Sequence, residues 1–199
     1  MKRKIGILGG TFDPPHLGHL IIANEVLHHL ALDEIHFMPN QEPPHKERVS
    51  GTTAEDRLRM LELSIAGNSQ FAVESIELER KGRSYTIDTI KILQELHPDF
   101  DYYFIIGADM VEYLPNWHEI DELVQLIQFV GVNRPNYQME SRYPVTHVDV
   151  PQIDISSTAM REKIKQDIST KYLIPDSVIG YIKERGLYEY GASNKDSWR

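Results

Sequence analysis

Two histidines three residues apart, His16 and His19, are the residues of this chain best suited to act on a phosphate group. Positions i and i+3 share one face of a helix, so both imidazoles would point the same way and could donate hydrogen bonds to one anion. They follow Gly9 and Gly10, which lack a Cβ atom and therefore let a ligand approach the backbone closely. If the segment opens a helix, its unpaired N–H groups add a partial positive charge. The pattern predicts a phosphate-binding site over residues 9–19.

Two other interpretations of the histidine pair stay open. Both side chains could lie on the surface without a role, or they could bind a metal ion together with His45 or Asp13, since imidazole is a common metal ligand. Familiar nucleotide motifs are missing: G-x-x-x-x-G-K-[ST] is absent, which speaks against a P-loop enzyme, and the glycine spacing does not fit G-x-G-x-x-G. The chain has no cysteine, so thiol nucleophiles, disulfides and cysteine zinc sites are excluded.

A second polar cluster lies late in the chain, where Ser156, Ser157 and Thr158 precede a predicted helix. Hydroxyl side chains cap a helix N-terminus and can also hold a phosphate there. Arg161 follows in the first turn, where a cation normally opposes the helix dipole. Its charge makes better sense if an anion binds at the same place, although a plain cap would also explain the hydroxyls. The cluster predicts a second set of phosphate contacts.

Short apolar runs alternate along the chain with stretches of helical periodicity. Strands are predicted at residues 5–8, 34–38, 71–79, 102–106, 129–132 and 145–150. Helices are predicted at residues 17–30, 54–66, 85–96, 119–126, 157–167 and 175–185. Thr53 is the predicted N-cap of the second helix. The alternation predicts an α/β fold of Rossmann-like, doubly wound form, a mostly parallel sheet with helices on both faces, whose ligands bind at the carboxyl ends of the strands.

No internal repeat or linker interrupts the chain, so a single domain is predicted over residues 1–190, with a flexible C-terminal tail over residues 191–199. The 199 residues carry a net charge of −9, which argues against nucleic acid as the main partner because binding to a phosphate backbone relies on excess Lys and Arg. No segment has the length of a signal peptide or a membrane span, so a cytoplasmic protein without a membrane partner is expected. A homo-oligomer such as a dimer is left open.

The sequence GGTFDPPHLGH at residues 9–19 resembles the opening motif of the nucleotidyltransferase superfamily, whose H-x-G-H signature falls on residues 16–19. Residues 155–161 resemble the second signature of that superfamily, I-S-S-T-x-x-R, and the two signatures occur in the expected order. Further segments over nearly the whole chain resemble the bacterial nicotinate mononucleotide adenylyltransferases: residues 38–40, 43–46, 57, 84–89, 106–109, 115–117 and 133–135. The resemblance implies transfer of AMP from ATP to nicotinate mononucleotide, giving nicotinate adenine dinucleotide and pyrophosphate in NAD biosynthesis, with Mg²⁺ as cofactor.

The resemblance also implies which residues form the site. The catalytic residues would be His16, His19, Lys46 and Arg161. The residues that bind ATP would be Gly9, Gly10, Thr11, Phe12, His16, His19, Gly107, Asp109, Ile155, Ser157, Thr158 and Arg161. The residues that bind the mononucleotide would be Asn40, Lys46, Thr86, Tyr113, Trp117 and Arg134. In this scheme Trp117 stacks on the nicotinate ring, while Thr86 and the backbone N–H of Tyr113 receive its carboxylate.

Three of these residues also have simpler interpretations. Lys46 could be a solvated lysine in a polar loop, and Asp109 could be a helix N-cap that accepts no ribose hydroxyl. Trp117 could belong to the core, with its ring unavailable to a base.

A nucleotide monophosphate is mostly a dianion at about pH 7, because its second pKa is about 6. It therefore needs no general base, and the expected reaction is direct in-line attack on the α-phosphorus of ATP without a covalent intermediate. The chain would supply charge neutralisation and alignment. His16 and His19 would contact the ATP phosphates, with His19 nearer the transferred group, while Arg161 and Lys46 would hold the pyrophosphate. Mg²⁺ is expected to bind through phosphate oxygens and water, with no protein ligand.

Rival functions stay open at this level. The acceptor could be nicotinamide mononucleotide or phosphopantetheine, and a non-catalytic nucleotide-binding module would keep the glycines without needing all four cationic residues. An RNA-binding relative of the aminoacyl-tRNA synthetases fits poorly with the net charge of −9.

Overall fold

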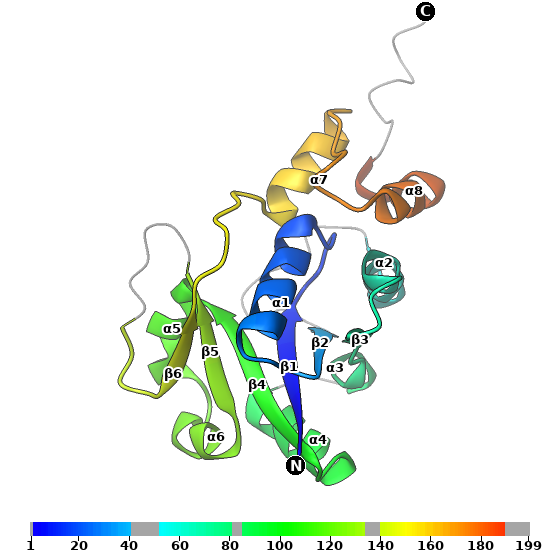
Figure 1. Ribbon diagram of the computed structural model, residues 1–199. Helices are drawn as coiled ribbons and strands as arrows, with labels where there is room; N and C mark the ends of the chain where they lie inside the picture. The colour runs from blue at the N-terminus through cyan, green and yellow to red at the C-terminus, as the bar shows by residue number, and fades with distance from the viewer. Residues whose placement is uncertain (1, 41–51, 81–84, 134–139, 190–199) are drawn as a thin grey trace, which may run out of the picture.

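Continuous apolar runs, without alternating polar residues, form the central strands of a six-stranded sheet (Figure 1). The structure is a computed structural model, and it describes residues 2–40, 52–80, 85–133 and 140–189. In β1, four consecutive residues from Ile5 to Leu8 are buried, as expected for a strand covered on both faces. The strands are β1 Arg3–Gly10, β2 Glu34–Pro39, β3 Phe71–Val73, β4 Phe100–Gly107, β5 Gln128–Val132 and β6 Val145–Val148. All neighbouring strands pair in parallel, which confirms the predicted α/β class.

The strand order of the sheet is β3-β2-β1-β4-β5-β6. The chain therefore adds β2 and β3 on one side of β1, and then crosses back to add β4, β5 and β6 on the other side of β1. Such a reversal leaves a crevice outside the carboxyl ends of the two central strands, where ligands of open α/β sheets bind. Gly10 ends β1 and Gly107 ends β4, so both predicted glycine positions lie at this switch point.

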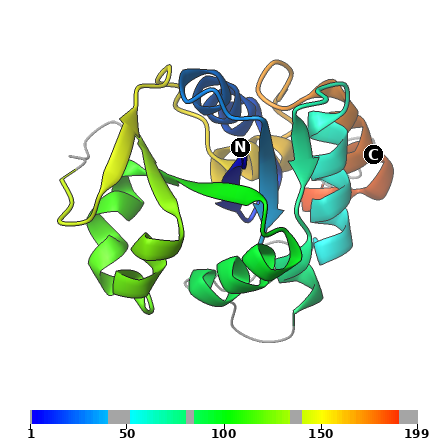
Figure 2. The same cartoon turned by 60° about the horizontal axis from the view of Figure 1, so that its bottom comes forward.

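Helices cover both faces of the sheet, as the alternation of elements predicted. They are α1 Leu17–His29, α2 Ala54–Ile65, α3 Ile76–Glu79, α4 Thr86–Leu96, α5 Ala108–Tyr113, α6 Ile120–Leu126, α7 Ser157–Lys165 and α8 Asp176–Arg185, with the short 3₁₀ helices η1 Leu114–Asn116 and η2 Leu187–Glu189. Alternate residues of β4 face opposite sides: Phe104 packs with α4 and α6, whereas Ile105 packs with α1 and α2. Figure 2 shows α1 and α4 on opposite faces.

A third, smaller apolar cluster lies between α2, α7, α8 and η2, apart from the two faces of the sheet. Met60 of α2, Met160 of α7 and Ile182 of α8 are each almost fully buried in it. The packing in this cluster holds α7 and α8 beside the carboxyl ends of the central strands, as Figure 1 shows.

Two stretches differ from the predicted secondary structure. Residues 71–79 were expected to be extended, but the strand ends at Val73 and α3 follows, with the N–H of Ile76 donating to the Glu74 carboxylate at 3.0 Å. Residues 108–116 form α5 and η1, which were not predicted. Both helical stretches are too short to show a clear period in the sequence. In the second stretch, Ala108, Val111 and Leu114 bury their side chains at helical spacing.

Helix α2 begins with the predicted cap. The hydroxyl of Thr53 accepts the N–H of Asp56 at 3.0 Å, and the Asp56 carboxylate accepts the N–H of Thr53 at 3.1 Å. The same buried carboxylate accepts the Tyr181 hydroxyl at 2.9 Å and Nε of Arg185 at 3.3 Å, both from α8. Burial acts to raise the pKa of Asp56, but the hydrogen bonds from Thr53 and Tyr181 and the charge of Arg185 outweigh it and hold that pKa below its usual value.

We expect Asp56→Asn to lower the free energy of unfolding by about 1 kcal/mol at neutral pH, since it weakens the cap and the contacts to α8. A carboxyl group whose pKa is lowered on folding stabilises the protein fully above its unfolded-state pKa and loses that contribution as the pH falls through its folded-state value. The difference between the two proteins in urea unfolding should therefore shrink below about pH 4. A difference that grows on acidification would contradict this assignment.

Candidate active site

The first loop joins β1 to α1 at the switch point and contains a cis peptide bond between Asp13 and Pro14. Phe12 adopts a positive φ of 51°, and its buried ring covers Gly10. A Cβ atom at Gly10 would lie 3.0 Å from that ring, so only glycine fits without displacing it. The ring also meets His19 edge-on, with ring centroids 5.0 Å apart. The loop thus packs against the helix that it introduces.

The two histidines stack on each other, with ring centroids 3.7 Å apart and an interplanar angle of 22°. His16 is the N-cap of α1 and is only 6% exposed, whereas His19 is half-buried one turn later. The backbone N–H of His16 donates to Nδ1 of His19 at 3.2 Å. Because Nδ1 of His19 is an acceptor, the proton of the neutral ring lies on Nε2, which makes Nε2 a donor. The pair shares one face, as its spacing predicted.

Helix α7 meets this loop although it lies far away in the sequence. The Ser157 hydroxyl donates to the carbonyl of Pro14 at 2.9 Å. Arg161 donates from Nη1 to the carbonyl of Asp13 at 2.7 Å and from Nη2 to the Thr158 hydroxyl at 3.2 Å. Figure 1 shows α7 beside the N-terminal end of α1. The two clusters singled out in the sequence are therefore adjacent in the fold.

Two further contacts complete this junction. A Cβ atom at Gly18 would lie 4.0 Å from Cβ of Ile155 and 3.0 Å from Nδ1 of His16, so the residue between the histidines faces both. The N–H of Leu17 donates to the carbonyl of Leu173 at 2.9 Å. Ser156 caps α7, its hydroxyl accepting the N–H of Ala159 at 3.2 Å. The N-termini of α1 and α7 thus lie close to one another.

Arg57 of α2 is a residue to which the sequence gave no role. It is 6% exposed, and its Nη1 donates to the carbonyl of Thr11 at 2.9 Å and to that of Asn40 at 2.7 Å. The N–H of Asn40 in turn donates to the carbonyl of Gly10 at 3.0 Å. Arg57 therefore joins the loops that follow β1 and β2. The available signal was an arginine on the face of α2 that also carries Met60, Leu61 and Ser64.

The residues assigned to the nicotinate ring lie around the end of β4. Trp117 follows η1 and is half-buried, its ring 5.9 Å from that of Phe104 and 5.7 Å from that of Phe129. The Phe104 ring lies 3.5 Å from the position of a Cβ at Gly9. The Trp117 ring thus packs partly against the core, and the Phe104 ring lies between it and Gly9 near the end of β1.

Thr86 and Tyr113 come from neighbouring helices. Thr86 is the first residue of α4, and the preceding Tyr85 lies against His118 with ring centroids 4.3 Å apart, which brings the start of α4 next to the Trp117 segment. Tyr113 ends α5 and is 42% exposed. Asp109 is not the N-cap of α5, because Gly107 holds that position and Asp109 lies in the first turn. Lys46 and Arg134 lie outside the described residues, as does the predicted tail over residues 191–199.

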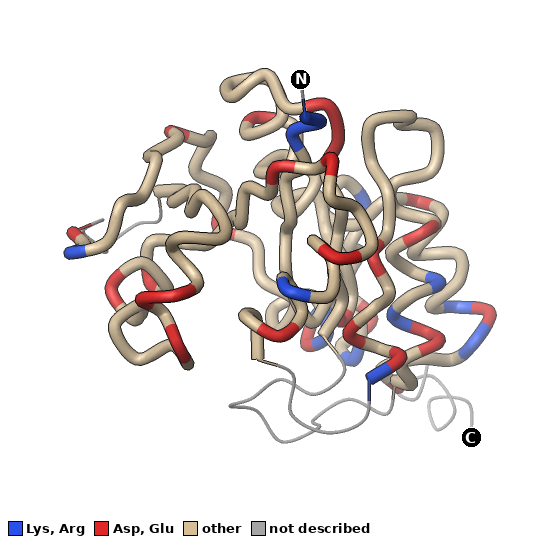
Figure 3. Tube along the Cα trace, turned by 90° about the horizontal axis from the view of Figure 1, so that it is seen from below, with Lys and Arg blue, Asp and Glu red and all other residues tan. Residues whose placement is uncertain are grey.

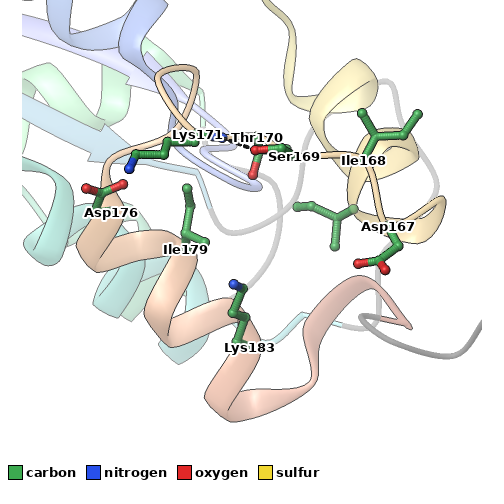
Figure 4. A pocket seen from close by; sticks show the side chains of 9 residues that line it. Asp167, Ile168, Ser169, Thr170, Lys171, Asp176, Ile179 and Lys183 are labelled. Atoms are coloured by element: carbon green, nitrogen blue, oxygen red, sulfur yellow. Dashed lines mark hydrogen bonds between the residues drawn. The ribbon is translucent and has the colours of Figure 1, made fainter. Parts of the chain in front are cut away.

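A cavity of about 440 Å³ opens between α7 and α8, and its wall includes Asp167, Lys171, Asp176 and Lys183 (Figure 4). None of the predicted site residues lines it. In the described ranges, no three His, Asp or Glu side chains gather in a way that could hold a metal ion. Figure 3 shows Lys and Arg interspersed with Asp and Glu along the described trace.

Comparison with known proteins decides the family. The model of the cytidylyltransferase-like family matches residues 7–163. A probable nicotinate-nucleotide adenylyltransferase of Geobacillus thermodenitrificans is 59% identical over 98% of this chain and 91% of its own length. The nicotinate-nucleotide adenylyltransferase of Bacillus subtilis is 54% identical over 94% of this chain and 99% of its own length. The chain belongs to the nicotinate-nucleotide adenylyltransferase family.

The fold agrees with that of a solved member of this adenylyltransferase family. The nicotinic acid mononucleotide adenylyltransferase of Plasmodium falciparum, solved in complex with NaAD, superposes with a TM-score of 0.80 at 22% identity, covering 94% of this chain and 98% of the other. The predicted membership of the nicotinate mononucleotide adenylyltransferases is confirmed. The family consists of nucleotidyltransferases, which typically use a divalent metal ion. Over the described residues, no helix of this member is long and apolar enough to span a membrane.

Proposed function

We propose that this chain transfers AMP from ATP to nicotinate mononucleotide, giving nicotinate adenine dinucleotide and pyrophosphate. The observation that carries the proposal is the contact between the loop bearing His16 and His19 and the start of α7 bearing Arg161, at the switch point of the sheet. The names of the relatives that are 54–59% identical support the same reaction.

The ATP phosphates would lie between the N-termini of α1 and α7. An α-helix leaves its first N–H groups without intrahelical partners, so the N–H groups of Ser157 and Thr158 would donate to the phosphates. The Nε2–H of His19 would donate to the transferred phosphate. His16 would also contact the ATP phosphates, farther from the transferred group. Arg161, with Lys46, would hold the leaving pyrophosphate. Gly9, Gly10, Thr11, Phe12, Gly107, Asp109 and Ile155 would complete the ATP site.

The mononucleotide would occupy the side of the crevice formed by α4, α5 and η1. Trp117 would stack on the nicotinate ring, with Thr86 and the N–H of Tyr113 on its carboxylate. Asn40 follows β2, and its N–H donates to the carbonyl of Gly10; in this proposal its side chain contacts the mononucleotide. The proposal also assigns Lys46 and Arg134, which lie outside the described residues, to the mononucleotide.

The phosphate of the mononucleotide attacks the α-phosphorus directly, because it is a dianion and needs no base. The protein then has two tasks: to align the two substrates and to neutralise the charge that moves to the pyrophosphate. The groups proposed to contact the phosphates, at the start of α7 and on His19, are N–H donors, which suit phosphate oxygens and not a cation. Mg²⁺ would therefore bind through phosphate oxygens and water, neutralising part of the phosphate charge.

An acceptor panel tests the proposed function. ATP is mixed with nicotinate mononucleotide, nicotinamide mononucleotide or phosphopantetheine, each with and without Mg²⁺, and released pyrophosphate is measured. We expect release with nicotinate mononucleotide to exceed that with the other acceptors, and to require the metal. Release with none of them would favour a nucleotide-binding module, and preference for another acceptor would replace the proposed substrate. Light scattering in the same buffer would show whether the chain forms a homo-oligomer such as a dimer, which the sequence left open.

We expect Trp117→Ala to raise the KM for nicotinate mononucleotide by about 10-fold or more and to leave the KM for ATP nearly unchanged, because a stacked base contributes about 1–3 kcal/mol. The KM values are compared with those of Trp117→Phe, which keeps an aromatic face and should lose less. Since Trp117 also packs on Phe104 and Phe129, both variants are checked by thermal unfolding. Equal changes in the two KM values would contradict stacking.

A further inference from the structure

The last helical turn of the described chain reaches back to the first loop. The Tyr188 hydroxyl, in η2, donates to Oδ1 of Asp13 at 2.6 Å, across 175 positions of sequence. The Thr52 hydroxyl donates to the same oxygen at 2.8 Å. Asp13 is 5% exposed, so this carboxylate is held inside the protein by hydroxyl groups from two distant segments. The segment around residues 187–189 therefore takes part in fixing the loop.

The backbone at Tyr188 is held in an unusual conformation. Its φ is 60° and its ψ is 31°, a left-handed region that bulky side chains rarely adopt. Such a conformation persists only where surrounding contacts impose it. Here the ring packs in the cluster between α2, α7 and α8, and the hydroxyl lies 3.8 Å from Sδ of Met60. Burial, followed by the nearby charge and hydrogen bond of Asp13, raises the pKa of Tyr188 well above its ordinary value, so the hydroxyl keeps its proton and donates.

The turn held by the Asp13 carboxylate also provides the two carbonyl groups that accept hydrogen bonds from α7. Arg161 donates to the carbonyl of Asp13 itself, and Ser157 donates to the carbonyl of Pro14. His16, the N-cap of α1, follows two residues later. Any shift of the turn would therefore move the arginine contact and the histidine pair relative to each other.

We infer that Tyr188 is a positioning residue for the reaction: its hydroxyl, through the Asp13 carboxylate, fixes the turn that sets the distance between the histidine pair and Arg161. The inference rests on the proposed function for the identity of the reaction. Tyr188 itself donates its hydroxyl proton to Asp13, lies against the sulfur of Met60 and is none of the residues assigned to a substrate, so its effect is transmitted through the loop. Misplacement of catalytic groups by about 1 Å can cost about 100-fold in rate.

Tyr188→Phe tests the inference, with Tyr181→Phe as a matched control. Both tyrosines belong to the C-terminal part of the fold and donate to a buried aspartate, Tyr188 to Asp13 at 2.6 Å and Tyr181 to Asp56 at 2.9 Å. Only the first aspartate lies in the loop before α1, whereas the second caps α2. The two substitutions remove the same group, so a purely structural role predicts the same consequences for both.

Two measurements are made on each full-length variant: steady-state turnover of ATP with nicotinate mononucleotide, and calorimetric binding of α,β-methylene ATP, whose methylene bridge blocks transfer. We expect Tyr188→Phe to lower kcat by about 10-fold and to weaken binding of the analogue by a similar factor, with the KM for the mononucleotide unchanged. Tyr181→Phe should stay within about twofold of the unaltered chain in both. Both variants should show a similar, small fall in Tm.

Equal behaviour of the two variants, once folded, overturns the inference. Should Tyr188→Phe not fold, Thr52→Val removes the other hydroxyl from the same Asp13 oxygen, and unchanged analogue binding by that variant would equally overturn it. If the unaltered chain released no pyrophosphate from ATP and nicotinate mononucleotide, the proposed function would fail. The comparison of analogue binding would still decide the role of Tyr188.

Discussion

Replacement of His19 by alanine is expected to lower kcat with ATP and nicotinate mononucleotide by on the order of 100-fold or more, the usual cost of losing one donor to a developing charge. His19 is half-buried, and its Nδ1 accepts the N–H of His16, so the neutral ring carries its proton on Nε2 and can donate from there. The measurement is single-turnover AMP transfer at saturating concentrations of both substrates, which reports the chemical step.

The matched control for this variant is His29→Ala, an exposed histidine in the last turn of the same helix. It should keep normal turnover. Because the His19 ring stacks on His16 and contacts Phe12, unfolding of His19→Ala is measured as well, and a loss of stability is expected alongside the loss of rate. His19→Asn, which retains an amide donor, should recover part of the rate. Near-normal transfer by a folded His19→Ala would refute the role.

Replacement of Arg161 by alanine is expected to lower kcat/KM for ATP by about 100-fold or more, since the variant loses a cation next to the phosphates. The side chain donates from both terminal nitrogens, to the carbonyl of Asp13 and to the Thr158 hydroxyl. This fixes the plane of the guanidinium while leaving it further N–H donors. Lysine cannot reproduce such a two-sided contact, so Arg161→Lys should recover only a minor part of the loss.

Lys163→Ala provides the charge-matched control for Arg161. It removes one positive charge from the same helix, two residues on and hence on nearly the opposite side. Its kcat/KM for ATP should stay close to that of the unaltered chain. If the two alanine variants lost activity equally, net charge and not the position of the guanidinium would be responsible, and the assignment of Arg161 to the pyrophosphate would be wrong.

The two predictions are linked by the geometry of the first loop. In the proposed reaction Arg161 would contact the phosphates from α7 and His19 from α1, and both residues depend on the same short turn between Phe12 and His16. Ser157 of α7 and Tyr188 of η2 contact that turn, and Arg57 of α2 contacts Thr11 just before it. The groups proposed for catalysis come from distant segments of the chain, and their positions thus depend on the same turn.

The sequence by itself determined the local parts of this protein. Buried apolar runs specified the strands, the Thr53 cap placed the start of α2, and the motifs at residues 9–19 and 155–161 indicated the family and the two phosphate-binding ends. Such features depend on residues close together in the chain, so their patterns can be read directly. The short segments α3, α5 and η1 escaped prediction because fewer than two turns show no period.

Only the tertiary structure decided which distant groups meet. Arg57 matched the family pattern without a stated role and Tyr188 drew no prediction, yet Arg57 joins two loops and Tyr188 holds the buried Asp13. Trp117 had two interpretations, and the fold shows that its ring packs on the core beside the crevice. A hydrogen bond across well over a hundred residues leaves no periodic trace in the sequence, because its geometry exists only after the sheet and its covering helices have assembled.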